Sequence, residues 1–360
     1  MMRSVLTLER FHIAEWYGRP FHRLDEKTRI ELANHLVGGA ALSKSEITRL
    51  TALESKAIES PLKTKEIDRL NELRQKLAKQ NAEEQVCPFK ADKTFATCTK
   101  PGGVCSIRLF QELGDEIQPI EGNRGRLRAL CPHRFHQHNT VFKKIGERLL
   151  EDADPIRAGE VGFLESTGSL DSDPGEDVGR IDMILVKSNQ LSSGRMEWIA
   201  VEVQAVYFSG KNMGLEFENL INTGGKLAMP VERRRPDYRS SGVKRLMPQL
   251  LTKVPTLRRW AKKMVVVVDA PFFHSLGKMA PERDVSNADI VWIVVDFVEN
   301  STTGQFELEV IDDYYTTLEN ATLGLTGGVP LSQPAFEDRI SAKIDKQKLP
   351  LTTARKTSTK

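Results

Sequence analysis

The strand-like run IAVEVQAV at residues 199–206 carries a carboxylate and an amide in otherwise apolar surroundings. Because side chains alternate between the two faces of a strand, Glu202 and Gln204 are expected on one face and the intervening apolar residues on the other. An unpaired charge on a half-buried face costs several kcal/mol. Glu202 therefore needs a partner elsewhere in the chain.

A second strand-like run, IDMILV at residues 181–186, offers that partner. The turn-forming segment KSNQLSSG joins the two runs and is centred near residue 191. In an antiparallel hairpin around this centre, Asp182 falls within a residue or two of Glu202. Facing like charges are destabilising unless a cation lies between them or one of them is protonated. A hard divalent ion, Mg²⁺ or Mn²⁺, suits two carboxylates, a carbonyl and waters.

Four cysteines form a second candidate site. They are Cys87, Cys98, Cys105 and Cys131, separated by 10, 6 and 25 residues. The spacing lacks the CxxC pairs of common zinc ribbons, but adjacent Pro and Gly residues help backbone amides to approach the sulfur atoms. Four thiolates suit tetrahedral zinc or iron, and four unrelated buried cysteines are the alternative. His133, His136 and His138 could replace a ligand, although phosphate contact or surface placement is favoured for them.

Positive charge is concentrated between residues 233 and 263, where eleven Lys or Arg side chains accompany one acid. The whole chain has a net charge of only +3, so the remainder is acidic. This segregation favours a nucleic acid on one face and a cation site elsewhere, with a solvated helix as the alternative. The candidate DNA contacts are Arg233, Arg234, Arg235, Lys244, Arg245, Arg258, Arg259, Lys262 and Lys263. The apolar residues expected to anchor this helix, which Pro248 and Pro255 should kink or break, are Val243, Met247, Leu250, Val254 and Leu257.

The elements that must position these residues indicate an α/β (α+β) protein with a mixed sheet flanked by helices. Strand-like runs separated by a basic helical stretch follow residue 155 in the 360-residue chain. We expect a cysteine-containing region at 1–145, a catalytic domain at 146–325 and a basic tail at 326–360, disordered from about 340. The apolar runs are too short to span a membrane, and no secretory signal is apparent, so a reducing, cytoplasmic location is expected.

Residues 40–80 contain a weak internal repeat. The segment 42–57 aligns with 62–77, and both have apolar residues at helical spacing. Ser43 and Glu46 form a potential capping box, and Pro61 separates the two halves. The repeat predicts a helical hairpin without catalytic residues.

The pattern D-x19-E-x-Q, with its acid pair on a hairpin, resembles the PD-(D/E)xK nuclease core. In that core an Asp opens one strand, and a Glu and a Lys alternate on the next. Gln204 occupies the position where Lys is usual, and an amide supplies neither positive charge nor a proton. A surface hairpin with solvated acids is the alternative interpretation.

Together, these features resemble the NotI family of restriction endonucleases. The resemblance rests on IAEWYG, on CPF…ATC…GVC…CPHR, on GE…D…ExQ with YFSGKN, and on ADIVWIVVDF. It covers most of residues 1–24 and 85–325, and the repeat at 40–80 looks like an insertion. The family also carries Glu-x-Gln, and the resemblance implies iron in the four-cysteine site. A further active-site glutamate of the family best matches Glu160, with Glu165 as its rival.

The resemblance implies a type II restriction endonuclease that hydrolyses phosphodiesters in double-stranded DNA with Mg²⁺. Asp182 and Glu202 would bind the metal, Glu160 would add a metal or water ligand, and Gln204 would position water or a phosphate oxygen. A palindromic target would imply a two-fold symmetric homodimer. A methyltransferase encoded beside the gene would favour a restriction-modification system. A non-catalytic DNA-binding protein and a repair or defence nuclease without a methyltransferase are the competing hypotheses.

Overall fold

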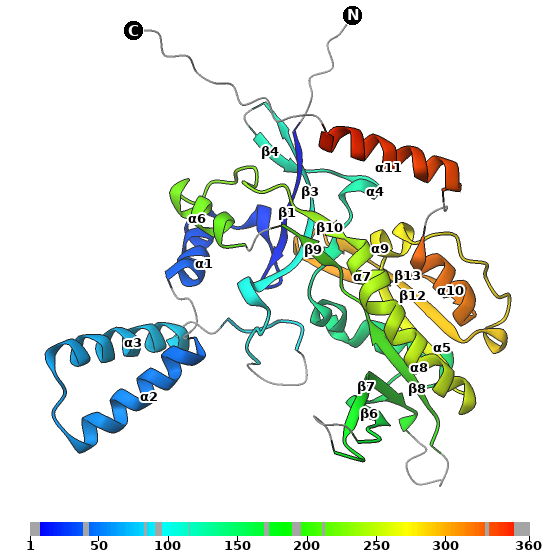
Figure 1. The fold of residues 1–360 in the computed structure, drawn as a ribbon, viewed down its shortest axis with the longest axis horizontal. Coiled ribbons are helices and arrows are strands. Elements are labelled where there is room, and N and C mark those ends of the chain that lie inside the picture. Colours follow the sequence, from blue (N-terminus) through cyan, green and yellow to red (C-terminus); the bar gives the residue numbers. More distant parts are fainter. Residues whose placement is uncertain are drawn as a thin grey trace, which may run out of the picture.

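The computed structural model describes residues 8–38, 43–82, 85–90, 96–114, 116–168, 173–188, 196–210, 213–327 and 331–348. A six-stranded mixed sheet is its largest element (Figure 1). In sheet order the strands are β13 (Phe306–Thr316), β12 (Ile290–Glu299), β11 (Met264–Asp269), β8 (Trp198–Val203), β7 (Asp177–Val186) and β6 (Ile156–Glu165). Strands β8, β11 and β12 run parallel, and the other neighbours pair antiparallel. Mixed strands and flanking helices confirm the predicted α+β class.

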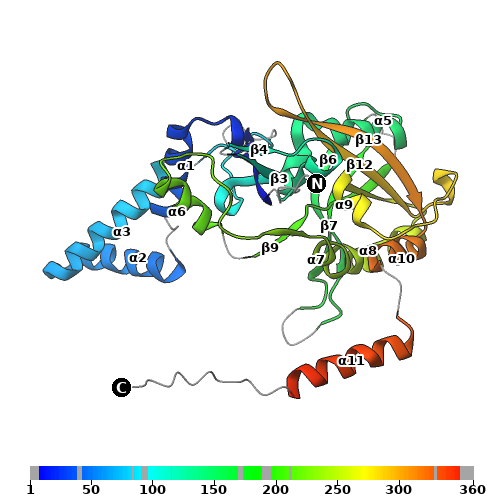
Figure 2. The ribbon, with the colours of Figure 1, turned by 90° about the horizontal axis from the view of Figure 1, so that it is seen from above.

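Helices cover both faces of this sheet. Helix α5 (Thr140–Leu149) packs Val141, Phe142 and Ile145 on one face. Helices α8 (Met247–Arg259) and α10 (Leu318–Thr326) cover the other face (Figures 1 and 2). Strands β11 and β12 read as nearly continuous apolar runs because both of their faces are buried. The short helix α9 (Ala270–Ser275) follows β11 directly.

A second sheet lies beside the first (Figure 2) and is built mainly from the N-terminal region. Its strands are β2 (Arg19–Pro20), β1 (Glu9–Trp16), β3 (Val104–Leu113) and β4 (Glu116–Pro119), with β5 (Arg128–Ala129) also paired to β3. The helices near it are α1 (Glu26–Gly38), α4 (Gly122–Gly125) and α6 (Gly214–Asn222). Phe217 of α6 stacks on Trp16 with ring centroids 5.2 Å apart. A helix from the second half of the chain thus completes the N-terminal core, and the boundary at residue 145 stays a prediction.

The repeat forms the predicted helical hairpin of α2 (Lys44–Glu59) and α3 (Thr64–Ala82). The capping box of Ser43 and Glu46 is present at the start of α2. Leu50, Leu53, Leu70 and Leu73 form a separate small core between the two helices. Figure 1 shows the hairpin projecting away from both sheets, which fits an insertion.

The basic segment departs from the predicted broken helix. A small sheet of β9 (Tyr207–Ser209) and β10 (Arg235–Asp237) leads into α7 (Tyr238–Ser241), a π-helical turn (Gly242–Leu246) and α8. Pro248 lies in the first turn of α8, where a missing N–H is tolerated. The helix continues past Pro255 to Arg259, so of the expected kink or break, the break does not occur at Pro255. Of the predicted anchor residues, Leu250, Val254 and Leu257 are buried, and Val243 and Met247 are partly buried.

The C-terminal expectation of disorder from residue 340 is also wrong for residues 340–348. These residues belong to helix α11 (Gln333–Lys348), in which Phe336, Ile340 and Ile344 recur at helical spacing. The periodicity begins before residue 340 and is lost when the tail is considered alone. Residues 349–360 lie outside the described part. No helix among the described residues is long and apolar enough to cross a membrane.

Candidate active site

The two acids predicted to face each other lie on neighbouring strands. Strands β7 and β8 pair antiparallel, with Met183 opposite Val201. Continuing this register by one residue places Asp182 opposite Glu202. The joining turn at 189–195 lies outside the described residues. Glu202 is 2 % exposed, whereas the side chain of Asp182 is 52 % exposed, so one carboxylate is buried and the other reaches solvent.

Strand alternation gives β8 two different faces, as its sequence predicts. Val201 and Ala205 belong to the core under α5. Ala200 belongs to the core under α8, and Glu202 and Gln204, two and four residues later, point to the same face of the strand. Strand β8 therefore directs its polar residues toward helix α8, at the end where β8 leaves the sheet.

Helix α8 provides the partner of Glu202, and sequence reasoning missed it. Lys253 Nζ donates a hydrogen bond of 2.6 Å to Glu202 Oε2 and lies 3.8 Å from Asp182 Oδ1. It also donates to Gln249 Oε1 at 2.8 Å. The signal was present in the sequence, because Lys253 lies on the apolar side of α8 beside Leu250 and Val254. A lysine in that position needs a buried anion.

The electrostatics of Glu202 reflect this surrounding. Burial, followed by the negative charge of Asp182, raises the pKa of Glu202 to about 8, and Lys253 opposes this shift. Two carboxylates that repel each other within reach of one cation are an arrangement common at functional sites. A bound cation would therefore reduce the repulsion between Asp182 and Glu202.

A cavity of about 540 Å³ opens beside the acid pair. Its lining includes Asp182, Glu202, Gln204, Tyr207, Lys244, Arg245 and Gln249. The amide Nε2 of Gln204 donates to Ala205 O at 2.5 Å. The guanidinium of Arg245 lies over the ring of Tyr207, 3.5 Å from its centroid, and forms part of the cavity rim. The cavity therefore combines carboxylates in its wall with cations at its edge, as a phosphate substrate requires.

The two candidates for the further glutamate differ in position. The β6–β7 register pairs Gly159 with Met183 and Val161 with Ile181, so residue 160 lies opposite Asp182. Glu160 has a left-handed φ of +51°, which is uncommon outside glycine. Its exposed carboxylate lies 3.7 Å from Arg180 Nη1. Glu165 pairs with Asp177, farther along the hairpin, and the choice between the two glutamates stays a prediction.

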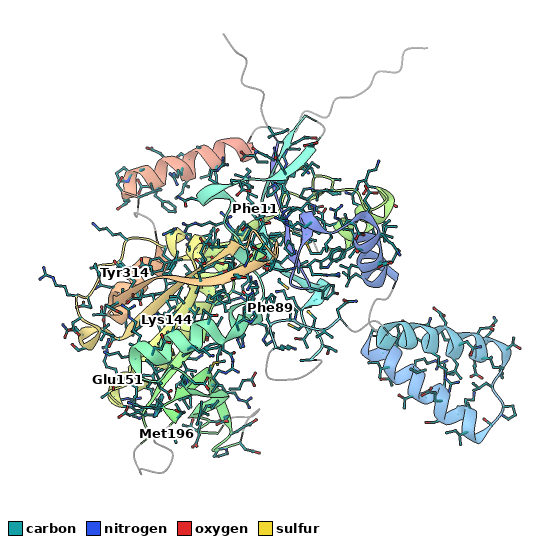
Figure 3. The ribbon with its side chains drawn as sticks, turned by 180° about the vertical axis from the view of Figure 1, so that it is seen from behind. Phe11, Phe89, Lys144, Glu151, Met196 and Tyr314 are labelled. Atoms are coloured by element: carbon teal, nitrogen blue, oxygen red, sulfur yellow. The ribbon has the colours of Figure 1, made fainter. Side chains whose placement is uncertain are left out.

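The four cysteines lie in one cluster between the N-terminal sheet and its flanking segments. Cys87, Cys105 and Phe89, which is labelled in Figure 3, pack together with the partly buried Cys98. Cys131 N donates to Cys105 O at 3.2 Å, which joins the fourth cysteine to the others. All four are free thiols. The cluster thus draws on sequence segments separated by more than 40 residues.

At least one backbone N–H group lies near each sulfur atom and favours its thiolate form. These N–H groups belong to Phe89 and Lys90 at Cys87, to Lys100 at Cys98, to Gly18 at Cys105, and to His133 and Arg134 at Cys131. The pKa of Cys87 falls to about 6, chiefly through a hydrogen bond with Cys98. That same bond raises the pKa of Cys98, whereas burial raises those of Cys105 and Cys131. Across the described part of the chain, no group of three or more His, Cys, Asp or Glu side chains is arranged to hold a metal ion.

The three histidines near Cys131 lie on one short helical segment. The rings of His133 and His136 contact each other edge-on, with centroids 5.4 Å apart. Burial lowers the pKa of His133. His138 has a left-handed backbone, with a φ of +52°. The backbone N–H of His133 lies near the thiol of Cys131.

The basic residues predicted to contact DNA do not form one surface. Arg233 and Arg235 line a second cavity of about 520 Å³ together with Arg10, Arg124 and Arg128. Arg234 also lines it, but its side chain is 1 % exposed and paired with Glu216, so we withdraw it as a phosphate contact. Lys244 and Arg245 line the cavity beside Asp182. Two separate cationic hollows thus flank strands β9 and β10.

The cations at the end of α8 have other partners. Arg258 pairs with Asp289 at 2.5 Å and with Glu319 at 3.2 Å, so its guanidinium already has anionic partners and we no longer expect it to contact a phosphate. Lys263 Nζ donates to Ala288 O at 2.5 Å. Lys262 lies 5.1 Å from the ring of Trp198, the first residue of β8. These residues therefore lie at the end of β8 opposite to Gln204.

Comparison with known proteins adds the family. No curated protein matches this chain. The family model for the restriction endonuclease NotI matches residues 71–308, which include the four cysteines, both facing acids, Lys253 and the basic segment. The IAEWYG segment lies outside that range, but the matched part is well over half of the chain. The chain belongs to the NotI restriction endonuclease family.

Proposed function

We propose that this protein is a type II restriction endonuclease that cleaves double-stranded DNA with Mg²⁺. The observation that carries the proposal is the acid pair on β7 and β8, Asp182 facing Glu202, in the wall of a cavity edged by Lys244 and Arg245. Family membership supplies the class of enzyme. The geometry supports the cavity beside this acid pair as the location of the chemistry.

The donor set fits Mg²⁺. Asp182 and Glu202 provide two carboxylates beside an open cavity, which leaves room for the waters that Mg²⁺ retains. The Lys253 ammonium already lies near both carboxylates, so a cation is compatible with this position. When bound there, Mg²⁺ would polarise a phosphate oxygen and lower the pKa of a water molecule.

The chain's own groups would hold the reactants for hydrolysis. Lys244 and Arg245 would bind the DNA backbone, and Gln204 would orient a water or a phosphate oxygen. The water oxygen forms a bond to phosphorus, while the phosphorus–oxygen bond to one deoxyribose breaks. One water proton goes to the departing sugar oxygen, and the product phosphate keeps the water oxygen and the second water proton. Two strand ends result, one of them phosphorylated.

We also propose that the six-stranded sheet is a PD-(D/E)xK-like core. The proposal is supported by the antiparallel β6–β7–β8 arrangement that carries the acids, and by the parallel β8–β11 pair linked through α8. Residue 160, opposite Asp182, would then provide the third carboxylate.

The cysteine cluster is proposed as a structural iron or zinc site held by Cys87, Cys98, Cys105 and Cys131. The proposal is supported by the packing of Cys87, Cys98 and Cys105 together, by the backbone hydrogen bond from Cys131 to Cys105, and by the backbone N–H groups near the sulfur atoms. Such a site would join β3 to segments without regular structure. Its contribution would be to folding rather than to hydrolysis.

The experiment that tests the function is digestion of unmethylated genomic DNA by the purified protein with Mg²⁺, followed by sequencing of the ends. We expect ends that share one motif, and a palindromic motif would support a two-fold homodimer. Ends without a common motif would indicate a nuclease of another class. Binding to duplex DNA without cleavage would favour the non-catalytic alternative.

A further inference from the structure

Strand β8 has no lysine beside Glu202, but helix α8 brings a lysine to the same carboxylate. Residue 204, two positions after Glu202, is an amide and brings no charge to the site. Lys253 brings an ammonium group to the same carboxylates from the helix that packs on this face of the sheet. We propose that Lys253 is a positioning residue of the nuclease site and supplies the positive charge that Gln204 lacks. This inference rests on the proposed function.

The surroundings of Lys253 distinguish it from the surface lysines of the basic segment. Its side chain is only 7 % exposed, and Glu202, to which it donates at 2.6 Å, is 2 % exposed. Lysine is almost never fully buried unless it is paired. A buried ion pair often contributes little net stability compared with apolar residues of similar volume, so stability alone is a weak reason for it.

The hydrogen bonds of Lys253 fix the direction of Glu202. Its Nζ bonds Glu202 Oε2 and Gln249 Oε1, both from residues that line the cavity. Asp182 Oδ1 lies 3.8 Å from Nζ, beyond hydrogen-bonding distance. The ammonium therefore lies behind Glu202 and holds one of its oxygen atoms. The Glu202 side chain, which lines the cavity, also lies within hydrogen-bonding reach of Asp182.

The positive charge of Lys253 would affect phosphodiester hydrolysis electrostatically, without touching the substrate. Hydrolysis develops negative charge on the phosphate, next to two carboxylates that repel it. A fixed cation within a few ångströms, in a poorly hydrated site, offsets that repulsion without moving. The helix thus performs electrostatically what a strand lysine would perform at residue 204.

The test first removes the positive charge at residue 253 and then restores a positive charge at residue 204. Lys253→Met removes the charge and retains a similar buried stem, and Gln204→Lys in that background returns a charge to the strand. Lys144→Gln is the matched control, since Lys144 lies on α5, on the other face of the sheet (Figure 3). The measurements are the single-turnover cleavage rate at saturating Mg²⁺, calcium affinity by titration calorimetry, DNA affinity with Ca²⁺, and melting temperature.

We expect Lys253→Met to lower the cleavage rate by about a hundredfold or more, the usual effect of losing one electrostatic contact to a transition state. Its DNA affinity with Ca²⁺ should stay within about threefold of the wild type, and calcium should bind no more tightly. The double variant should cleave at least about tenfold faster than Lys253→Met, because the charge is restored. Lys144→Gln should match the wild type in all four measurements.

Several results would overturn the inference. A wild-type rate for Lys253→Met with tighter calcium binding would make Lys253 a counter-ion that the metal displaces. A folded double variant no faster than the single variant would show that charge is not what Lys253 supplies. Unfolding of both variants would assign Lys253 to the fold rather than to the site. Absence of cleavage by the wild-type protein would instead remove the proposed function, and this inference with it.

Discussion

At the scale of single residues, the candidate site depends on contrasting environments for two like charges. Asp182 is open to solvent and Glu202 is buried against Lys253, although the two lie opposite each other. A purely structural pair would place both acids in water. The contrast suggests different roles in binding a cation. Asp182 can be reached from the cavity, and Glu202 is held in place by Lys253 of helix α8.

The first prediction is that Asp182→Asn and Glu202→Gln each abolish cleavage but leave DNA binding largely intact. Each substitution removes one negative charge from the proposed metal site without changing side-chain size. Cleavage of a cognate duplex with Mg²⁺ and binding with Ca²⁺ are the two measurements. The conservative exchange Asp173→Asn, on a described residue outside the cavity, serves as control. Either site variant cutting at near the wild-type rate would contradict the metal assignment.

The second prediction concerns His12 of β1, which is buried beside the N-terminal sheet. Its Nδ1 accepts from the N–H of Ile13 at 2.8 Å, and burial lowers its pKa to about 4. The unfolded chain binds a proton near pH 6.5, whereas the folded chain resists it down to about pH 4. Stability is therefore full above pH 6.5 and falls as the pH drops toward 4.

We expect His12 to remove about 2 kcal/mol of the free energy of unfolding between pH 7 and pH 5. Urea unfolding of the wild type and of His12→Gln at both pH values measures this difference. The variant should be less stable at pH 7 but should lose less stability on acidification. Equal losses in both proteins would show that another group titrates.

At the scale of elements, the apolar runs predicted the strands because β8, β11 and β12 are covered on both faces. The helical hairpin followed equally from local spacing and its capping box, which need no distant partner. The hairpin register followed from a turn centre near residue 191, within one position of the observed pairing of Met183 with Val201. Local patterns were sufficient for these features.

The contact of Lys253 with Glu202 could not be obtained in the same way. It depends on α8 crossing from β9 and β10 to β11 on one particular face of the sheet, which no short stretch specifies. The burial of Arg234 likewise depends on Glu216 of α6, a helix that packs against the N-terminal domain. Long-range packing thus decided which charges of the basic segment remain available.

The third prediction concerns the cysteine cluster, which joins β3 to segments before and after it. Cys105→Ala should lose the bound metal and lower the melting temperature, because a structural site contributes folding free energy directly. Elemental analysis should find about one iron or zinc per wild-type chain. A well-folded wild-type protein without either metal would contradict the prediction. Ser43→Ala, in the separate hairpin, controls for nonspecific destabilisation and should retain the metal.

At the scale of the whole molecule, cations gather on both sides of the β9–β10 ribbon. Tyr207 and Phe208 of β9 border the acid-lined cavity, and Arg235 of β10 borders the arginine-lined one. The ribbon pairs Phe208 with Pro236, so the two hollows adjoin one short element. A DNA backbone that follows both hollows would pass the acid pair, which makes this face the expected substrate surface.

The last prediction separates this face from the end of α8. Lys244 and Arg245 line the cavity, whereas Arg258 is already held by Asp289 and Glu319. Each lost phosphate contact should lower the slope of log affinity against log salt by about one unit and weaken all sequences alike. The double substitution of Lys244 and Arg245 by Ala should therefore reduce the slope by about two units, for cognate and random duplex equally. The same exchange at Arg258 and Arg259 should leave the slope unchanged. A reduced salt slope in the Arg258 and Arg259 variant would place DNA along α8 as well. If the Lys244 and Arg245 variant lost its sequence preference at an unchanged salt slope, these two residues would read bases.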